Sequence, residues 1–152
     1  MTTDLAGFAL FNPQTDEAFA ARMTPVRLDA IRRIEAGGYR LRFLVIESRG
    51  PLSREVHVVA HSPSGGCARS RFSESFSPGL LVVQGETSVE RPHRRRGLAD
   101  AMYVTAEVIT SRMLYPLWDA GLQQSDGGQA LWKWCRREGR VRPFGPREDR
   151  EA

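Results

Sequence analysis

Apolar and polar residues alternate along the first half of the chain with the period of two that is typical of half-buried β-strands. The alternation runs over residues 39–48 and again over 56–60, and the turn sequence at 62–66 predicts an antiparallel return over 67–73. A longer run over 80–89, rich in Leu and Val, predicts a strand near the centre of a sheet. We therefore expect an antiparallel meander followed by a central strand.

Two other stretches have the helical period. Thr24 offers an N-cap hydroxyl, the proline after it suits the first helical position, and the glycine pair 37–38 ends the helix. A second helix is predicted over 97–110, with one apolar face and with Asp100 and Glu107 turned away from it. Both segments are expected to pack an apolar face on the sheet.

The remaining patterns are shorter. They indicate strands at 8–11 and 113–117, one or two helical turns at 16–23, and a last helix over 125–138. The resulting order describes an α+β or α/β domain, with a mixed, mainly antiparallel central sheet and helices on both faces.

A length of 152 residues favours a single domain. We divide it into an N-terminal strand and helix region, 1–38, and a core, 39–139. Residues 140–152, rich in charge, Pro and Gly, are expected to form a final strand stub or a flexible basic tail.

Composition narrows the class of protein. With 41% hydrophobic and 26% charged residues, disorder throughout is excluded. No apolar run reaches the roughly 18 residues that span a bilayer, and the first residues do not resemble a secretory signal, so a cytoplasmic protein that does not bind a membrane is expected. The two cysteines, Cys67 and Cys135, lack the spacing of a zinc site, and we expect no metal. The net charge of +4 suits an anionic ligand or a nucleic acid.

The segment 89–99 carries the most informative chemistry. It leaves the predicted central strand and opens the second helix, where free N–H groups and the helix dipole favour a bound anion. Gly97 allows close approach of a ligand to the backbone, Ala99 keeps the next turn thin, and the arginines at 94–96 add positive charge. This pattern predicts a site for a phosphate or a pyrophosphate.

The hexad from Arg94 to Ala99 fits the pattern Gln or Arg, two residues of any type, Gly, any residue, Gly or Ala. With its strand and helix context, the sequence resembles the GCN5-related N-acetyltransferase (GNAT) superfamily, loosely from about Tyr39 to Gly139. The resemblance implies a GNAT-like fold and acetyl-coenzyme A as co-substrate. It places the pyrophosphate on the amides of Arg94, Arg95, Arg96, Gly97, Leu98 and Ala99. It also places the pantetheine arm along the backbone of Ser88, Val89 and Arg91.

The implied reaction is direct attack of a small-molecule or peptidyl amine on the thioester. A strand amide near Val89 is a candidate oxyanion donor. Glu86 and Glu90, four residues apart on one strand face, are candidate bases. Many family members carry a tyrosine acid on the last helix, whereas this sequence has none there and offers Cys135.

Other interpretations remain open at this point. Residues 98–112 can be aligned with a helix-turn-helix pattern, which is the DNA-binding alternative, although bulky Tyr103 stands where the turn usually has glycine. A non-catalytic coenzyme A binder, or an enzyme acting on an RNA-bound amine, would keep the same fold. His57 and His61 share one strand face without a third ligand. The sequence leaves open whether the chain forms a homodimer.

Overall fold

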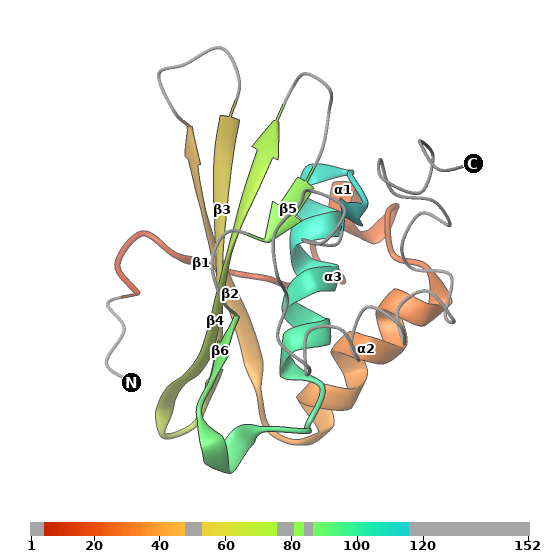
Figure 1. The fold of residues 1–152 in the computed structure, drawn as a ribbon. Helices are drawn as coiled ribbons and strands as arrows, with labels where there is room; N and C mark the ends of the chain where they lie inside the picture. Colours follow the sequence, from red (N-terminus) through yellow and green to blue (C-terminus); the bar gives the residue numbers. More distant parts are fainter. Residues whose placement is uncertain (1–4, 48–52, 76–80, 84–86, 116–152) are drawn as a thin grey trace, which may run out of the picture.

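The computed structural model describes residues 5–47, 53–75, 81–83 and 87–115 (Figure 1). These residues form a mixed α+β arrangement with an open, mainly antiparallel sheet and few helices. The elements in chain order are β1 (Ala9–Leu10), α1 (Glu17–Ala20), α2 (Pro25–Ala36), β2 (Arg40–Glu47), β3 (Ser53–Ser62), β4 (Gly65–Ser75), β5 (Leu81–Val83), β6 (Ser88–Val89), the 3-10 turn η1 (Arg91–His93), α3 (Leu98–Thr110) and β7 (Leu114–Tyr115).

The sheet has the strand order β1-β2-β3-β4-β5-β7, with β6 pairing beside β5 along the same edge of β4. The pairs from β1 to β5 are antiparallel, as the alternation predicted, and the pair of β5 with β7 is parallel. A parallel pair needs a crossover, and here α3 supplies it. The expected antiparallel meander is confirmed. The run after it, 80–89, also has the expected central position in the sheet, because β5 lies between β4 and β7.

Local sequence signals explain the ends of the first long helix. The Thr24 hydroxyl accepts a hydrogen bond from the Arg27 amide at 3.2 Å, and Pro25 occupies the first turn. After Ala36 the chain turns through Gly38, whose φ of +88° favours glycine. The short helix α1 begins in a similar way, with the Asp16 carboxylate accepting from the Phe19 amide.

The described helices lie on one side of the sheet (Figure 1). The core between α2, α3 and this helix-facing side of the sheet contains Ile31, Ile34, Leu41, Val56, Val58, Phe72, Leu81, Leu98, Met102 and Val108. We call the opposite side of the sheet the outer face. The expectation of helices on both faces is not met by the described residues, and the last predicted helix, 125–138, lies outside them.

Two expectations about the central strand and the second helix need correction. The described part of the run 80–89 contains two strands, β5 and β6, which pair with β4 in different registers. Helix α3 is buried on almost every side, and Asp100 and Glu107 are only 3% and 1% exposed, so neither is turned to solvent. Residues 98–110 also form one uninterrupted helix, with no turn at Tyr103 and therefore no helix-turn-helix. The periodicity of the sequence could not show that α2 and the sheet together enclose α3.

Candidate functional site

The loop between β6 and α3 is the predicted anion site. It follows Val89, passes through η1 at Arg91–His93, and reaches Gly97, the N-cap residue of α3. The strand fixes the start of this loop and the helix fixes its end. The predicted order of strand, basic loop and helix is therefore confirmed.

The backbone of this loop leaves helix donors unused. Arg95 and Gly97 have left-handed backbone conformations, with φ of 63° and 85°. A left-handed residue with a side chain costs about 1 to 2 kcal/mol, and such residues cluster at ligand sites. No side chain caps α3, and the amides of Gly97, Leu98 and Ala99 donate no hydrogen bond within the described part of the chain. These amides can donate to an anion.

The other side of the loop is anchored by packing. The Tyr39 hydroxyl and His93 Nδ1 form a hydrogen bond of 2.8 Å, and the two rings meet edge to face. A Cβ atom added to Gly97 would lie 3.4 Å from Cδ of Arg33 on α2 and 3.9 Å from Cγ2 of Ile34. The end of α2 and the start of β2 thus hold the loop in place.

The three loop arginines have different roles. Arg94 Nε donates to the Val89 carbonyl oxygen at 3.0 Å and so ties the loop back to β6. Arg95 and Arg96 are exposed and form no ion pair or hydrogen bond with other described residues. All three arginines therefore keep their positive charge at the loop, and the hydrogen bond to Val89 fixes the position of Arg94.

One edge of β6, beside this loop, is not paired with any strand in the described part of the chain. The Glu90 amide donates to the Cys67 carbonyl oxygen at 2.9 Å, and Ser88 lies opposite Arg69 on β4. In an antiparallel ladder this register directs the Ser88 backbone groups toward β4 and those of Val89 toward the other edge. No described strand pairs with that other edge of β6. Because Arg94 already donates a hydrogen bond to the Val89 carbonyl oxygen, the Val89 amide is the backbone group of this residue that can bind a ligand.

The neighbouring strand explains why this edge has no described partner strand. β7 pairs with β5 at Leu81↔Leu114 and Val82↔Tyr115, at the beginning of the central run. Farther along the run, β6 pairs with β4 alone among the described strands. An unpaired strand edge thus leads to the donor amides at the start of α3. An extended ligand with an anionic end suits this arrangement.

The predicted catalytic residues are only partly covered by the structure. Glu90 directly follows β6 as the N-cap residue of η1 and is half-buried. Glu86 and Cys135 lie outside the described residues, so the shared face of Glu86 and Glu90 and the role of Cys135 stay predictions. Burial, and secondarily the charge of Glu90, raise the pKa of the Cys67 thiol above its ordinary value.

A chain of hydroxyl groups beside the central run was not predicted. The Ser70 and Thr87 hydroxyls are 2.8 Å apart, and the Thr87 hydroxyl lies 3.3 Å from the Tyr103 hydroxyl on α3. Tyr103 is only 5% exposed. A buried tyrosine usually has a hydrogen-bond partner for its hydroxyl, and a tyrosine in this largely apolar helix was the available signal.

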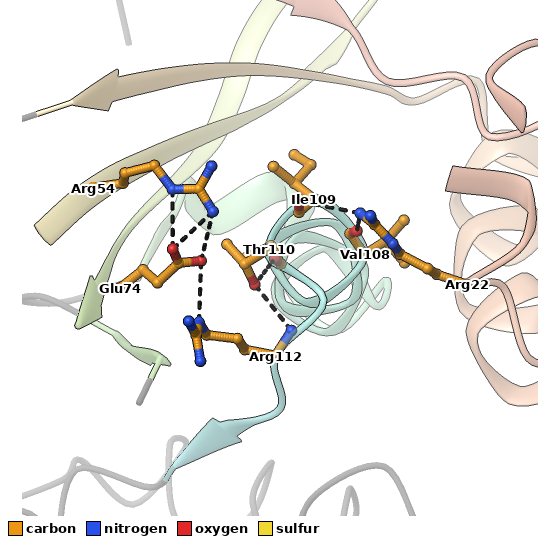
Figure 2. Close-up of polar contacts among 8 residues, drawn as sticks. Arg22, Arg54, Glu74, Val108, Ile109, Thr110 and Arg112 are labelled. Carbon is orange, nitrogen blue, oxygen red and sulfur yellow. Dashed lines mark hydrogen bonds and ion pairs between the residues drawn. The ribbon is translucent and has the colours of Figure 1, made fainter. Parts of the chain in front are cut away.

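Polar contacts fix the far end of α3 (Figure 2). Arg22 Nη1 donates to the carbonyl oxygens of Val108 and Ile109, at 2.7 and 3.3 Å, and so satisfies the helix C-terminus. The buried Glu74 carboxylate accepts from Arg54 and forms an ion pair with Arg112, which follows α3. These contacts position the whole helix, including its N-terminus at the candidate site.

Glu107 adds a buried carboxyl group near this end. Its Oε2 accepts from the Leu114 amide at 3.2 Å and links α3 to β7. Burial raises its pKa from 4.5 to about 7, although Arg27 and the Leu114 amide act in the opposite direction. The sequence pattern had placed this residue away from the apolar face of the helix.

The paired histidines lie on the outer face, away from the loop. His57 Nε2 lies 3.0 Å from Glu55 Oε2, and His61 lies opposite Arg40 on β2. The described residues contain no cluster of three or more His, Cys, Asp or Glu side chains that suits a metal ion. None of the described helices is long and apolar enough to cross a membrane.

Comparison of the chain with protein-family models, with curated proteins and with solved structures found no match. The class of molecule is thus defined by its mixed, mainly antiparallel α+β arrangement and by the loop that opens α3.

Proposed function

We propose that this chain is a GNAT-type N-acetyltransferase that moves an acetyl group from acetyl-coenzyme A to a primary amine of a small molecule or peptide. The observation that carries the proposal is the continuity of two features, the uncapped N-terminus of α3 and the edge of β6 that no described strand pairs with. A diphosphate fits the first feature and an extended amide-containing arm fits the second.

The order of the elements supports the finer, GNAT-like description of the fold. An antiparallel meander leads to the strand that precedes the Arg94–Ala99 hexad, α3 follows the hexad, and β7 returns parallel to β5. The loose sequence resemblance implies this order. Among the described strands β7 pairs with β5 and none pairs with the outer edge of β6, which is where the resemblance places the pantetheine arm.

The residues around the hexad have separate roles in binding. The amides of Gly97, Leu98 and Ala99, with the side chains of Arg95 and Arg96, bind the pyrophosphate. Arg94 holds the loop against Val89. The backbone groups of Ser88 pair with β4, so the pantetheine arm pairs with the Val89 amide. Arg91 is exposed at the rim of the site.

The chemical step is the attack of the neutral amine nitrogen on the thioester carbonyl carbon. The carbonyl oxygen gains negative charge, the carbon–sulfur bond breaks, and the coenzyme leaves as a thiolate that takes up a proton. A backbone amide such as that of Val89 can stabilise the developing oxyanion without reorganisation. Glu90 or Glu86 accepts the amine proton, and Cys135 or water protonates the thiolate.

Calorimetric titration of the full chain with coenzyme A and acetyl-coenzyme A tests binding. We expect micromolar binding that Gly97→Glu abolishes, because the new carboxylate repels the diphosphate. Gly38→Glu is the matched control, since Gly38 has φ of +88° against +85° at Gly97 and takes up the same charge and backbone strain elsewhere. Equal loss in both variants, or no coenzyme binding by the unaltered chain, would overturn the proposal.

Turnover is tested by thiol release from acetyl-coenzyme A with a panel of primary amines. Glu86→Gln and Glu90→Gln are compared by their pH–rate profiles, and the variant that removes the base loses at least about tenfold in rate. Tight coenzyme binding with no turnover on any amine contradicts the enzymatic assignment and leaves a non-catalytic coenzyme A binder.

A further inference from the structure

The outer face of the sheet carries a concentration of arginines that the candidate site does not use. The strand registers place Arg40 and Arg42 of β2 and Arg69 and Arg71 of β4 on this face. The described helices lie on the other side of the sheet (Figure 1). Arg40, Arg69 and Arg71 are exposed and Arg42 is half-buried. We call these four residues the arginine face.

The arginines of this face make few contacts within the described part of the protein, as do Arg95 and Arg96 of the loop. Several arginines elsewhere donate to carbonyl or carboxylate oxygens of the chain, namely Arg22, Arg27, Arg54 and Arg94, and Arg112 forms an ion pair with Glu74. By contrast, Arg42, Arg69 and Arg71 form no ion pair or side-chain hydrogen bond with any described residue. Arg40 donates only to main-chain carbonyls and keeps its charge uncompensated.

The surroundings of the arginine face keep its potential positive. Of the carboxylates on the described strands, Glu55 alone lies on the outer face, and it contacts His57. The pKa of His61 is lowered from 6.5, first by burial and then by the positive charges of Arg42 and Arg40. The face is therefore complementary to a polyanion.

The geometry of the arginine face suits a regular row of phosphates. Arg69 and Arg71 are two residues apart on one strand, about 7 Å, and Arg42 lies two strands away, about 9 to 10 Å. The planar guanidinium fork binds phosphate oxygens at two points. The apolar residue between Arg42 and Arg69 in the register, Val59, is only 2% exposed, so the centre lacks the exposed apolar anchor of a protein interface.

Other occupants fit the charge less well. A second copy of the chain bound through the same face would bring like charges together. Residues 116–152 carry seven basic and six acidic side chains, so their composition is not that of an acidic partner. Leu10 and Ile46 are exposed on the same face, 45% and 42%, and make an anionic membrane the alternative to be tested.

We propose that the arginine face binds the phosphodiester backbone of a nucleic acid duplex without reading its sequence. Backbone contacts of this kind need basic groups and neither base edges nor stacking aromatic rings. The proposal is independent of the acetyltransferase proposal, because it uses a different surface and needs no coenzyme. It is also distinct from helix-turn-helix recognition.

The test is fluorescence anisotropy of the full chain, without coenzyme, against labelled DNA and RNA duplexes of equal length over a salt series. Arg42→Gln/Arg69→Gln is expected to weaken binding at least tenfold and to reduce the slope of log K against log salt by about 1.8 for DNA, two phosphate contacts. Arg94→Gln/Arg95→Gln removes the same charge from the loop and is expected to have a much smaller effect. An equal or larger loss in the loop variant overturns the assignment to this face.

Three further arms complete the test. Arg40→Gln/Arg71→Gln changes exposed positions of the same face and replaces the first variant if circular dichroism shows that the latter does not fold. Polyglutamate carries carboxylates in place of phosphates, and its equal competition with DNA would contradict the proposal. Binding to vesicles of phosphatidylcholine and phosphatidylserine, with none to either duplex, would overturn it in favour of a membrane.

Discussion

Arg95 has an unfavourable backbone conformation in the loop that precedes α3. Its φ of 63° is unfavourable for a side chain with a Cβ atom, whereas Arg96 beside it has no positive φ. Both side chains are exposed and without partners among the described residues. The backbone at position 95 is thus held by the loop path and not by contacts of its own side chain.

Because of this strain, we expect substitution by glycine to change the stability differently at positions 95 and 96. Arg95→Gly relieves about 1 kcal/mol of left-handed strain, which offsets the 0.5 to 1 kcal/mol that the flexible glycine costs. Arg96→Gly carries the entropic cost alone. We expect Arg95→Gly to melt about 2 to 4 °C above Arg96→Gly in thermal unfolding, at equal net charge. Equal melting temperatures, or the reverse order, would show that the loop is not strained at Arg95.

At the scale of elements, α3 connects the two ends of the molecule. Its N-terminus leaves amides unused at Gly97–Ala99, whereas its C-terminal carbonyls are satisfied by Arg22 (Figure 2). Glu107 then ties the helix to β7 through the Leu114 amide. The contrast between a satisfied C-terminus and a free N-terminus supports a binding role for the latter.

The contact of α3 with β7 is expected to depend on pH. Because burial raises the folded pKa of Glu107 from 4.5 to about 7, its protonated form contributes stability that is complete below pH 4.5 and lost as pH rises to about 7. The corresponding fall in the free energy of unfolding is roughly 3 kcal/mol at most. Glu107→Gln is expected to remove this part of the pH dependence in urea unfolding between pH 5 and 8.

Exposed Glu35 provides the control for that measurement, because Glu35→Gln removes one carboxyl group without changing the interior. If Glu107→Gln and Glu35→Gln have the same pH dependence as the unaltered chain, Glu107 does not titrate in this range.

At the scale of the whole molecule, one buried cluster joins several elements. Glu74 of β4 accepts from Arg54 of β3 and pairs with Arg112, between α3 and β7 (Figure 2). The Glu74 side chain has no solvent exposure, whereas each arginine side chain is 29% exposed. The carboxylate is therefore the fully buried member of the cluster, and both arginines pair with it.

We expect Glu74→Gln to lower the free energy of unfolding by about 3 kcal/mol, because removing one partner of a buried pair leaves the others uncompensated. Denaturant unfolding measures this against Glu47→Gln, an exposed glutamate on β2. The double variant Arg54→Gln/Glu74→Gln should lose less than the sum of the single changes. A loss for Glu74→Gln no larger than that for Glu47→Gln would mean that the cluster does not stabilise the fold.

Much of the fold could be predicted because its signals are local. Thr24 caps α2 as expected, the alternation at 39–48 and 56–60 corresponds to β2 and β3, and the hexad opens α3. The loop of the candidate site was also located in this way, since Gly97 and its neighbours are contiguous in the chain. The fate of individual side chains was harder to predict, as the internal use of Arg94 and the burial of Glu107 show.

The amino-acid sequence by itself determined the position and type of the main strands and helices and the place of the basic loop, because periodicity and capping depend on residues within a few positions of one another. Only the tertiary structure decided that β5 and β6 pair with β4 in different registers, that the Val89 amide faces an edge without a described partner strand, and that Arg94 donates to a carbonyl while other arginines lie on the outer face. These properties depend on which distant segment of the chain lies alongside each residue, and a local sequence pattern does not contain that information.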